Sequence, residues 1–162
     1  MDNKEEFIEI IKENNGLIYK IARAYTASKT DEQDLYQDII YQLWKSFPFF
    51  RKEAKISTWM YRIALNTSIA HLNKEKKRGS QIPISEILMN KPDFDDTLKK
   101  ERIEDLYAWI KNLNPVEKGI IVLYLEGKNY EEIAGITGFT STNVGTRLAR
   151  IKQKLITQIK TH

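Results

Sequence analysis

The segment YEEIAGITGFTSTNVGTRL, residues 130–148, decides the fold near the end of this chain. Asn129 stands before it and Glu132 three residues later, which is the pattern of a capping box at the start of a helix. Gly138 provides a turn, because glycine adopts a positive φ easily. Thr140 is placed to cap a second helix. The segment therefore predicts a helix-turn-helix.

The second helix of this segment has an apolar stripe beside a polar, cationic one. The apolar stripe is expected to be buried and consists of Val144, Leu148, Ile151 and Leu155. A recognition helix in a major groove needs such a polar stripe, with its N-terminal residues at base edges and its cations on phosphates. The candidates for duplex contact are Ser141, Thr142, Asn143, Thr146, Arg147, Arg150 and Lys154. An ordinary helical hairpin with a solvated charged face is the alternative.

Residues 31–44, DEQDLYQDIIYQLW, predict a helix with one apolar face and one acidic edge. The apolar positions recur at i, i+4 and i+8 and are Leu35, Ile39 and Leu43. Asp34 and Asp38 belong to a second stripe, offset by about 100° of helix. An acidic helix in a chain of net charge +4 suggests a basic protein surface as its partner.

The basic residues are concentrated in two regions. Residues 51–78 hold eight basic residues against two acidic ones, a net charge of +6, and residues 143–162 hold five and none. Two separated basic patches suggest two contacts with nucleic acid. Aromatic rings alternate with cations from residue 47 to residue 62, which suits single-stranded nucleic acid because bases stack on the rings. Among these rings we expect Phe47 and Trp59 to be packed and Phe50 to be exposed.

The composition argues against enzymes, metal centres and membrane proteins. The chain has no cysteine, only two histidines and no glycine-rich phosphate loop, so we expect no catalytic residue, metal site or cofactor. The first residues lack the features of a signal peptide. No apolar run approaches the roughly 20 residues of a membrane span. We expect a cytoplasmic protein without membrane insertion.

The periodic segments predict an all-α fold of two small helical domains joined by a flexible linker. The N-terminal helical bundle is expected at residues 1–78, the linker at 79–97 and the helix-turn-helix domain at 98–162. The linker is proline-containing and without a sustained period. The expected helices are residues 3–14 and 16–27, separated near Gly16, then 31–46, 57–77, 98–112, one from Pro115, and the two of the helix-turn-helix.

These motifs together resemble bacterial RNA polymerase sigma factors. The resemblance rests on D-x-x-Q-D at residues 34–38, L-W at 43–44, STWMYRIALN at 57–66, the following basic run and the C-terminal helix-turn-helix. More narrowly, the chain is similar to the small two-domain extracytoplasmic-function (ECF) group of the sigma-70 family. The match covers nearly the whole chain in the right order.

The resemblance implies a transcription initiation factor that binds core RNA polymerase and directs it to promoter DNA. The implied polymerase contacts are Asp34, Gln37, Asp38, Leu43 and Trp44. The implied contacts with the −10 element, which the first domain would recognise and open without ATP, are Phe50, Arg51, Lys55, Ser57, Thr58, Arg62, Asn66 and Asn73. The helix-turn-helix candidates named above would read the −35 element.

Three departures from the family pattern and one rival interpretation remain. The family often has Arg where Leu65 stands, Asp where Ala70 stands, and Lys or Arg where Gly145 stands. The charges absent at Leu65 and Gly145 leave the promoter sequence open. The chain shows no sensor domain, so we expect control by an anti-sigma factor. The rival is a stand-alone helix-turn-helix regulator, which should dimerise and bind a palindromic site without polymerase.

Overall fold

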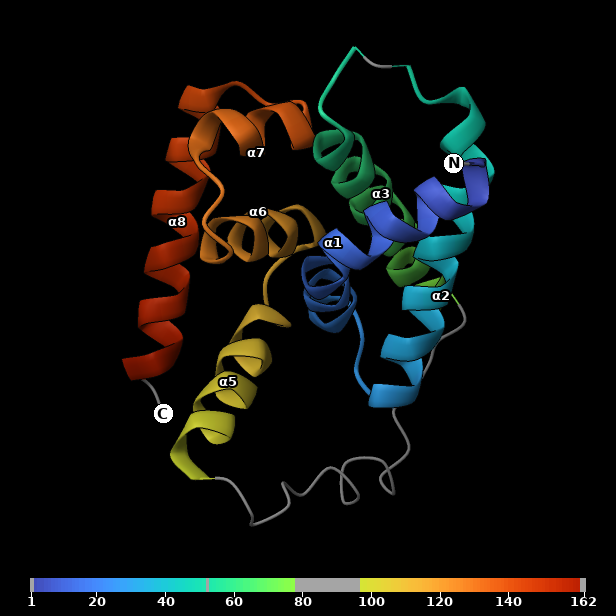
Figure 1. Cartoon of the computed structure of the whole chain (residues 1–162). Coiled ribbons are helices and arrows are strands. Elements are labelled where there is room, and N and C mark those ends of the chain that lie inside the picture. Colours follow the sequence, from blue (N-terminus) through green and yellow to red (C-terminus); the bar gives the residue numbers. More distant parts are fainter. Residues whose placement is uncertain (1, 52, 78–96, 161–162) are drawn as a thin grey trace.

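The computed structural model describes residues 2–51, 53–77 and 97–160, and every regular element within these ranges is helical (Figure 1). The elements are α1 (Asn3–Ala24), α2 (Lys29–Ser46), the short 3₁₀ helix η1 (Phe47–Phe49), α3 (Ile56–Lys77), α5 (Thr97–Ile110), α6 (Pro115–Leu125), α7 (Tyr130–Thr137) and α8 (Ser141–Lys160). The all-α prediction is confirmed. The predicted linker, residues 79–97, lies outside the described residues except for Thr97, where α5 begins.

Helices α1, α2 and α3 pack together as the N-terminal bundle. The predicted apolar stripe of α2 is fully buried at Leu35, Ile39 and Leu43. Polar side chains also join the bundle, since the Tyr61 hydroxyl of α3 donates to Asn14 Oδ1 of α1 at 2.7 Å. The acidic helix is therefore anchored by its apolar face, and its acidic edge is left outside.

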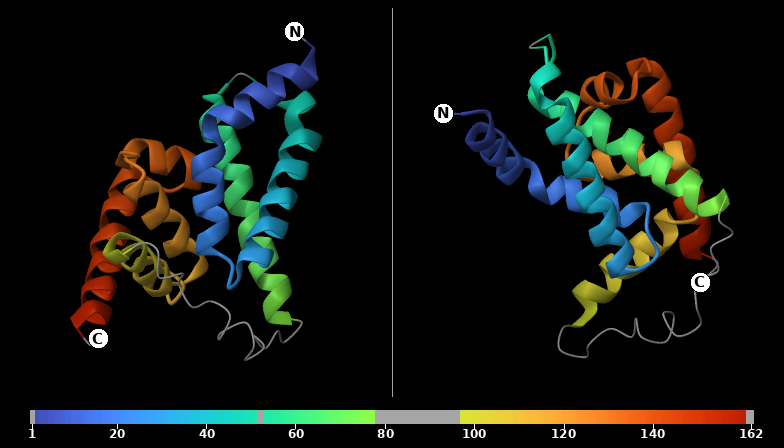
Figure 2. Two further views of the ribbon diagram at one scale, coloured as in Figure 1. Left: turned by 60° about the horizontal axis from the view of Figure 1, so that its bottom comes forward. Right: turned by 90° about the vertical axis from the view of Figure 1, so that its right-hand side faces the viewer.

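The predicted break near Gly16 is wrong, because α1 runs from Asn3 to Ala24 as one helix. A glycine inside a helix costs only about 1 kcal/mol relative to alanine. Leu17 and Ile18 follow immediately and are buried, and burial of such side chains contributes more than that cost. The helix bends along its length instead of ending (Figure 2).

The start of α2 also differs from the prediction. Its N-cap is Ser28, whose Oγ accepts a hydrogen bond from the Asp31 backbone N–H at 3.1 Å. The helix was expected to begin at residue 31, because Thr30 and Asp31 also carry side chains that can cap a helix, and sequence alone does not rank neighbouring candidates. The change lengthens the helix by about half a turn and leaves its faces unchanged.

The C-terminal domain contains α5 to α8, and its predicted signals are confirmed. Asn129 and Glu132 form both hydrogen bonds of a capping box at the start of α7. Gly138 ends that helix with φ of +87°. Thr140 Oγ1 accepts from the Asn143 backbone N–H at 3.1 Å as α8 begins. The apolar stripe of α8 is buried from Val144 to Leu155.

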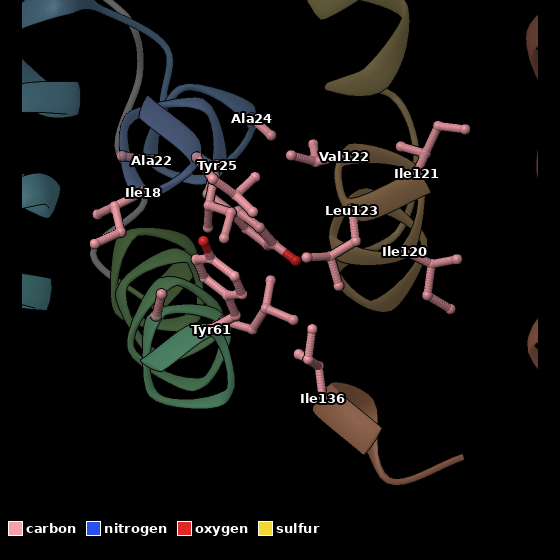
Figure 3. Close-up of a cluster of buried hydrophobic side chains, with 14 of the residues drawn as sticks. Ile18, Ala22, Ala24, Tyr25, Tyr61, Ile120, Ile121, Val122, Leu123 and Ile136 are labelled. Atoms are coloured by element: carbon pink, nitrogen blue, oxygen red, sulfur yellow. The ribbon is translucent and has the colours of Figure 1, made fainter. Parts of the chain in front are cut away.

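The two domains pack against each other and share one apolar cluster. Helix α6 contacts α8 on one side, and α1 and α3 on the other. Figure 3 shows Tyr25 at the end of α1 and Tyr61 of α3 beside Leu123 of α6 and Ile136 of α7. The Tyr25 hydroxyl donates to the Pro115 carbonyl, which joins the end of α1 to the start of α6.

Candidate nucleic-acid interface

The acidic edge of α2 is exposed as predicted, but one of its proposed contact residues is not. Asp34, Gln37 and Asp38 lie at the surface. Leu43 has 0% exposure and belongs to the apolar core, so it supports this surface without being part of it. Trp44 is 43% exposed, and its ring centroid lies 5.1 Å from that of Phe7, which holds the indole in place.

Tyr41 is a further exposed residue of this surface that the sequence reasoning missed. Its side chain is 58% exposed, and it follows Asp38 by three residues and Asp34 by seven. Residues at those spacings share a helix face. The helical spacing was a usable signal, but an aromatic residue within an amphipathic helix is more often assigned to the core.

The aromatic residues after α2 form a chain of ring contacts that separates packed rings from exposed ones. The Phe47 ring lies 5.5 Å from Phe7, and the Trp59 ring lies 4.9 Å from Phe50. Phe50 is therefore half-buried against Trp59. Phe49 is 81% exposed, so the prediction that chose Phe50 as the exposed ring was wrong. Phe49 is the last residue of η1 and Phe50 the residue that ends it, and sequence alone does not say which of two adjacent rings packs on Trp59.

An open hollow of about 490 Å³ lies between the start of α1 and the segment that follows α2. Phe47, Pro48 and Phe50 line one side and Glu6 and Ile10 of α1 line another. The hollow combines aromatic walls with a polar rim. Enzymes that flip a base out of a duplex hold it between aromatic or apolar side chains, so the hollow is a candidate for contact with an unstacked base.

Most of the candidate DNA contacts on and before α3 are exposed, and one of them forms a hydrogen bond to the other domain. Arg51, Lys55, Asn66 and Asn73 are exposed, whereas Ser57 and Thr58 are half-buried. Arg62 is exposed, but its Nη2 donates to the Gly135 carbonyl of α7 at 2.6 Å. In this arrangement the guanidinium of Arg62 contacts the other domain.

The N-terminal part of α8 holds Arg147 in a defined position. Its Nε donates to Asn143 Oδ1 at 2.6 Å, and its guanidinium carbon lies 4.2 Å from the centroid of the Phe139 ring. These contacts leave the terminal nitrogens of the guanidinium available. Asn143 therefore orients Arg147, in addition to its predicted role at a base edge.

The remaining α8 candidates divide into exposed residues and one with an internal partner. Thr142, Thr146 and Arg150 are exposed, while Ser141 is half-buried. Lys154 Nζ lies 2.6 Å from Glu117 Oε2, a carboxylate that is itself nearly buried. This ion pair gives Lys154 a structural role inside the domain.

Comparison with known families decides what these surfaces belong to. The family described as Sigma-70 region 2 matches residues 10–78, and the family described as Sigma-70 region 4 matches residues 103–155. RNA polymerase sigma factor SigV of Bacillus subtilis is 31% identical over 150 residues, which cover 91% of this chain and 87% of SigV. The chain belongs to the ECF group of the sigma-70 family.

Other relatives and solved structures agree with this assignment. The ECF RNA polymerase sigma-E factor of Haemophilus influenzae is 28% identical over 148 residues, covering 82% of this sigma factor and 77% of the relative. RpoE of Bartonella quintana, solved with the anti-sigma factor NepR, matches 96% of this chain and 98% of its own with a TM-score of 0.77 at 19% identity. CnrH, solved with the cytosolic domain of CnrY, matches 98% of this chain and 90% of its own, with a TM-score of 0.73 at 18% identity. At these identities the two structures establish the fold.

Two of the departures of this sigma factor from the family pattern, at Leu65 and Gly145, lie at close contacts in the structure. Leu65 is buried where it meets Gly119 of α6. A Cβ added at Gly145 would lie 3.2 Å from Cε2 of Tyr130, so the ring of that tyrosine occupies the space beside the glycine. In the described part of the chain, no helix is long and apolar enough to cross a membrane, and no three acidic or histidine side chains gather as a metal site would require.

Proposed function

We propose that this transcription initiation factor uses three separate surfaces for its three tasks. The acidic edge of α2, with Asp34, Gln37, Asp38 and Trp44, binds core RNA polymerase. The segment from η1 into α3 recognises the −10 element as it opens, and the N-terminal half of α8 reads the −35 element in duplex form. The observation that carries the proposal is the separation of charge, since carboxylates repel DNA and favour a basic protein surface.

Strand opening at the −10 element follows from binding energy, with no ATP hydrolysis and no catalytic residue in the sigma factor. Phe49 presents an exposed ring on which an unpaired base can stack. The hollow beside Phe50 can hold a base that leaves the duplex. Arg51 and Lys55 follow Phe49 and Phe50 closely in the sequence, so their cations can hold the phosphates next to the captured bases. Each contact is made only with the open strand, so the set shifts the equilibrium towards opening.

Recognition of the −35 element centres on Arg147. An arginine that makes two hydrogen bonds to guanine O6 and N7 is the commonest specific contact in a major groove. The contacts with Asn143 and Phe139 fix the side chain before binding, so less conformational entropy is lost on DNA. Arg150 lies further along α8 and suits a backbone phosphate.

Regulation is expected to come from a partner. CnrH and RpoE were solved with CnrY and with the anti-sigma factor NepR. We infer that an anti-sigma factor likewise controls this chain, and that it works in the cytoplasm, where polymerase and promoter DNA are found. Such a partner would cover one or more of the three surfaces.

The polymerase surface is tested by reversing a charge. Asp38→Arg should abolish co-elution with core polymerase in size-exclusion chromatography, because Asp38 is exposed and its replacement repels a basic surface. Asp105→Arg is the matched control, since it makes the same change at an exposed site on α5. Both variants should keep the wild-type helical content by circular dichroism.

The same experiment distinguishes the rival function. Unchanged binding by Asp38→Arg would remove α2 as the docking site. A free protein that elutes as a dimer and never joins the polymerase would favour a stand-alone regulator.

A further inference from the structure

One wall of the hollow beside Phe50 is polar and belongs to the first turns of α1. Asn3, Glu6 and Ile10 line it, and residues at these spacings share a helix face. Asn3 and Glu6 are exposed, and Ile10 is half-buried. The hollow therefore has an amide and a carboxylate in addition to the aromatic wall formed by Phe47 and Phe50.

The polar wall is held in place by the packing of the next residue. Phe7, which follows Glu6, is buried. Its ring centroid lies 5.1 Å from that of Trp44 and 5.5 Å from that of Phe47, so the start of α1 is fixed against the end of α2 and against η1. The helix also begins with a side-chain cap at Asp2. The backbone that carries Glu6 is therefore positioned before any ligand binds.

The carboxylate of Glu6 is available to a ligand. None of the ion pairs among the described residues involves this side chain. An ionised carboxylate only accepts hydrogen bonds, whereas an amide such as that of Asn3 both donates and accepts. The polar wall therefore offers a charged acceptor beside a group that can satisfy a donor or an acceptor of the ligand.

This chemistry distinguishes the bases by their amino groups. A protein that holds an extruded base reads it by hydrogen bonds to its Watson–Crick edge. Adenine, cytosine and guanine each carry an amino group that can donate to a carboxylate. Thymine has no amino group, and its N3–H lies between two carbonyl oxygens that a carboxylate repels. Glu6 therefore favours a base with an amino group over thymine.

A purely structural role accounts for acidic residues at this place but not for the position of Glu6. Glu5 and Glu6 both lie in the first turn of α1, where negative charge interacts favourably with the helix dipole. Only Glu6 lines the hollow. Both residues precede the segment that matches Sigma-70 region 2, which begins at residue 10, so the family match assigns neither of them a role.

We propose that Glu6, assisted by Asn3, selects the base that enters the hollow and admits bases with an amino group in preference to thymine. The inference rests on the proposed function, in which the hollow holds one base of the opened −10 strand. Glu6 is then a specificity-determining residue for promoter opening. It lies in the first turn of α1, outside the segment from η1 into α3 that we assign to the −10 element.

The test measures the affinity of reconstituted holoenzyme for promoter fragments whose non-template −10 strand is left single-stranded. Because the strand is already unpaired, the stability of the duplex does not enter the comparison. Each position of the −10 strand is occupied in turn by each of the four bases. The variant is Glu6→Ala, and Glu5→Ala is the matched control, since it removes the same charge in the same turn of α1 at an exposed residue outside the hollow.

We expect one position at which the wild type binds thymine at least about fivefold more weakly than the preferred amino base, which is the size of one good base contact. Glu6→Ala should reduce this preference to less than about twofold at that position alone, and Glu5→Ala should keep it. A wild type that discriminates against thymine at no position would overturn the inference. An equal loss of affinity for all four bases in Glu6→Ala would also refute it.

A second measurement removes the amino group from the base instead of the carboxylate from the protein. Purine replaces adenine, 2-pyrimidinone replaces cytosine or hypoxanthine replaces guanine, whichever base is preferred at the position. The analogue should weaken binding by the wild type at least about fivefold and binding by Glu6→Ala less than about twofold, because the two changes remove the same hydrogen bond. An equal loss in both proteins would show that Glu6 does not contact the amino group.

Failure of this inference and failure of the proposed function give different results. Holoenzyme that binds these fragments no better than single strands of unrelated sequence would remove the proposed role of the N-terminal domain, and this inference with it. Sequence-specific binding of the −10 strand that Glu6→Ala leaves unchanged at every position would refute the role of Glu6 alone.

Discussion

Replacing Phe49 by alanine should impair promoter opening without destabilising the protein. The ring is 81% exposed, so its removal takes little apolar area out of the folded state. Surface substitutions of this kind change the free energy of unfolding by less than about 0.5 kcal/mol. Phe50→Ala is the contrasting variant, because the Phe50 ring packs 4.9 Å from that of Trp59.

The expected size of the effect follows from one lost stacking contact. Stacking of a base on an aromatic side chain contributes about 1–3 kcal/mol, which is an approximately 5- to 140-fold change in an equilibrium constant. Phe49→Ala should reduce the equilibrium constant for promoter opening by this factor at constant polymerase affinity. Phe50→Ala should cost about 2 kcal/mol of stability, roughly half the cost of removing a fully buried phenylalanine ring.

The assay is the fluorescence of 2-aminopurine placed in the −10 element, followed with holoenzyme carrying either variant. Urea denaturation of the free proteins supplies the stabilities. If Phe49→Ala opened the promoter as well as the wild type does, the exposed ring would have no role in strand capture. Equal destabilisation by both variants would show that the distinction between exposed and packed rings is wrong.

Three further outcomes are expected. Burial raises the pKa of the Tyr25 hydroxyl far above its usual value of 10.0, so the folded chain keeps a proton that the unfolded chain loses. The free energy of unfolding should therefore be highest below pH 10.0 and fall above it, and urea denaturation of Tyr25→Phe should show a shallower alkaline fall. An equally steep fall in that variant would assign the effect to other groups. Arg147→Ala should lose about 1–3 kcal/mol of discrimination at one base pair of the −35 element, measured by competition with single-base variants. Asn143→Ala should reduce discrimination at the same base pair. If Arg147→Ala instead lost affinity equally for all sequences and in a salt-dependent way, Arg147 would be a phosphate contact. Lys154→Ala should lower the melting temperature, because it leaves the nearly buried Glu117 without its ion-pair partner; a loss of DNA affinity at constant stability would contradict this role.

The local signals in the sequence were sufficient to predict the helix-turn-helix. Capping residues such as Asn129 and the positive-φ Gly138 act on neighbouring backbone, so their effect is readable from spacing alone. The buried stripe of α8 was predicted for the same reason, because helical periodicity assigns residues to faces. Gly16 was misread because the cost of a glycine was weighed without the burial of the residues that follow it.

The candidate site was predictable as a set of segments, but not at the level of individual side chains. Leu43 fell inside the core and Tyr41 outside it, although both lie on the helix that the sequence identified. The meeting of Leu65 with Gly119 could not be predicted, because no local pattern links residues so far apart in the chain. The glycine at this contact is informative only once the packing of α6 is known.

Transcription by reconstituted holoenzyme on genomic DNA, with start sites mapped, tests the central claim most directly. Core polymerase with this protein should initiate at a limited set of sites, each preceded by one shared sequence near −10 and another near −35. Core polymerase alone, or with the Asp38→Arg variant, should not use them. Absence of such initiation, together with binding of the free protein to a palindromic duplex, would contradict the account.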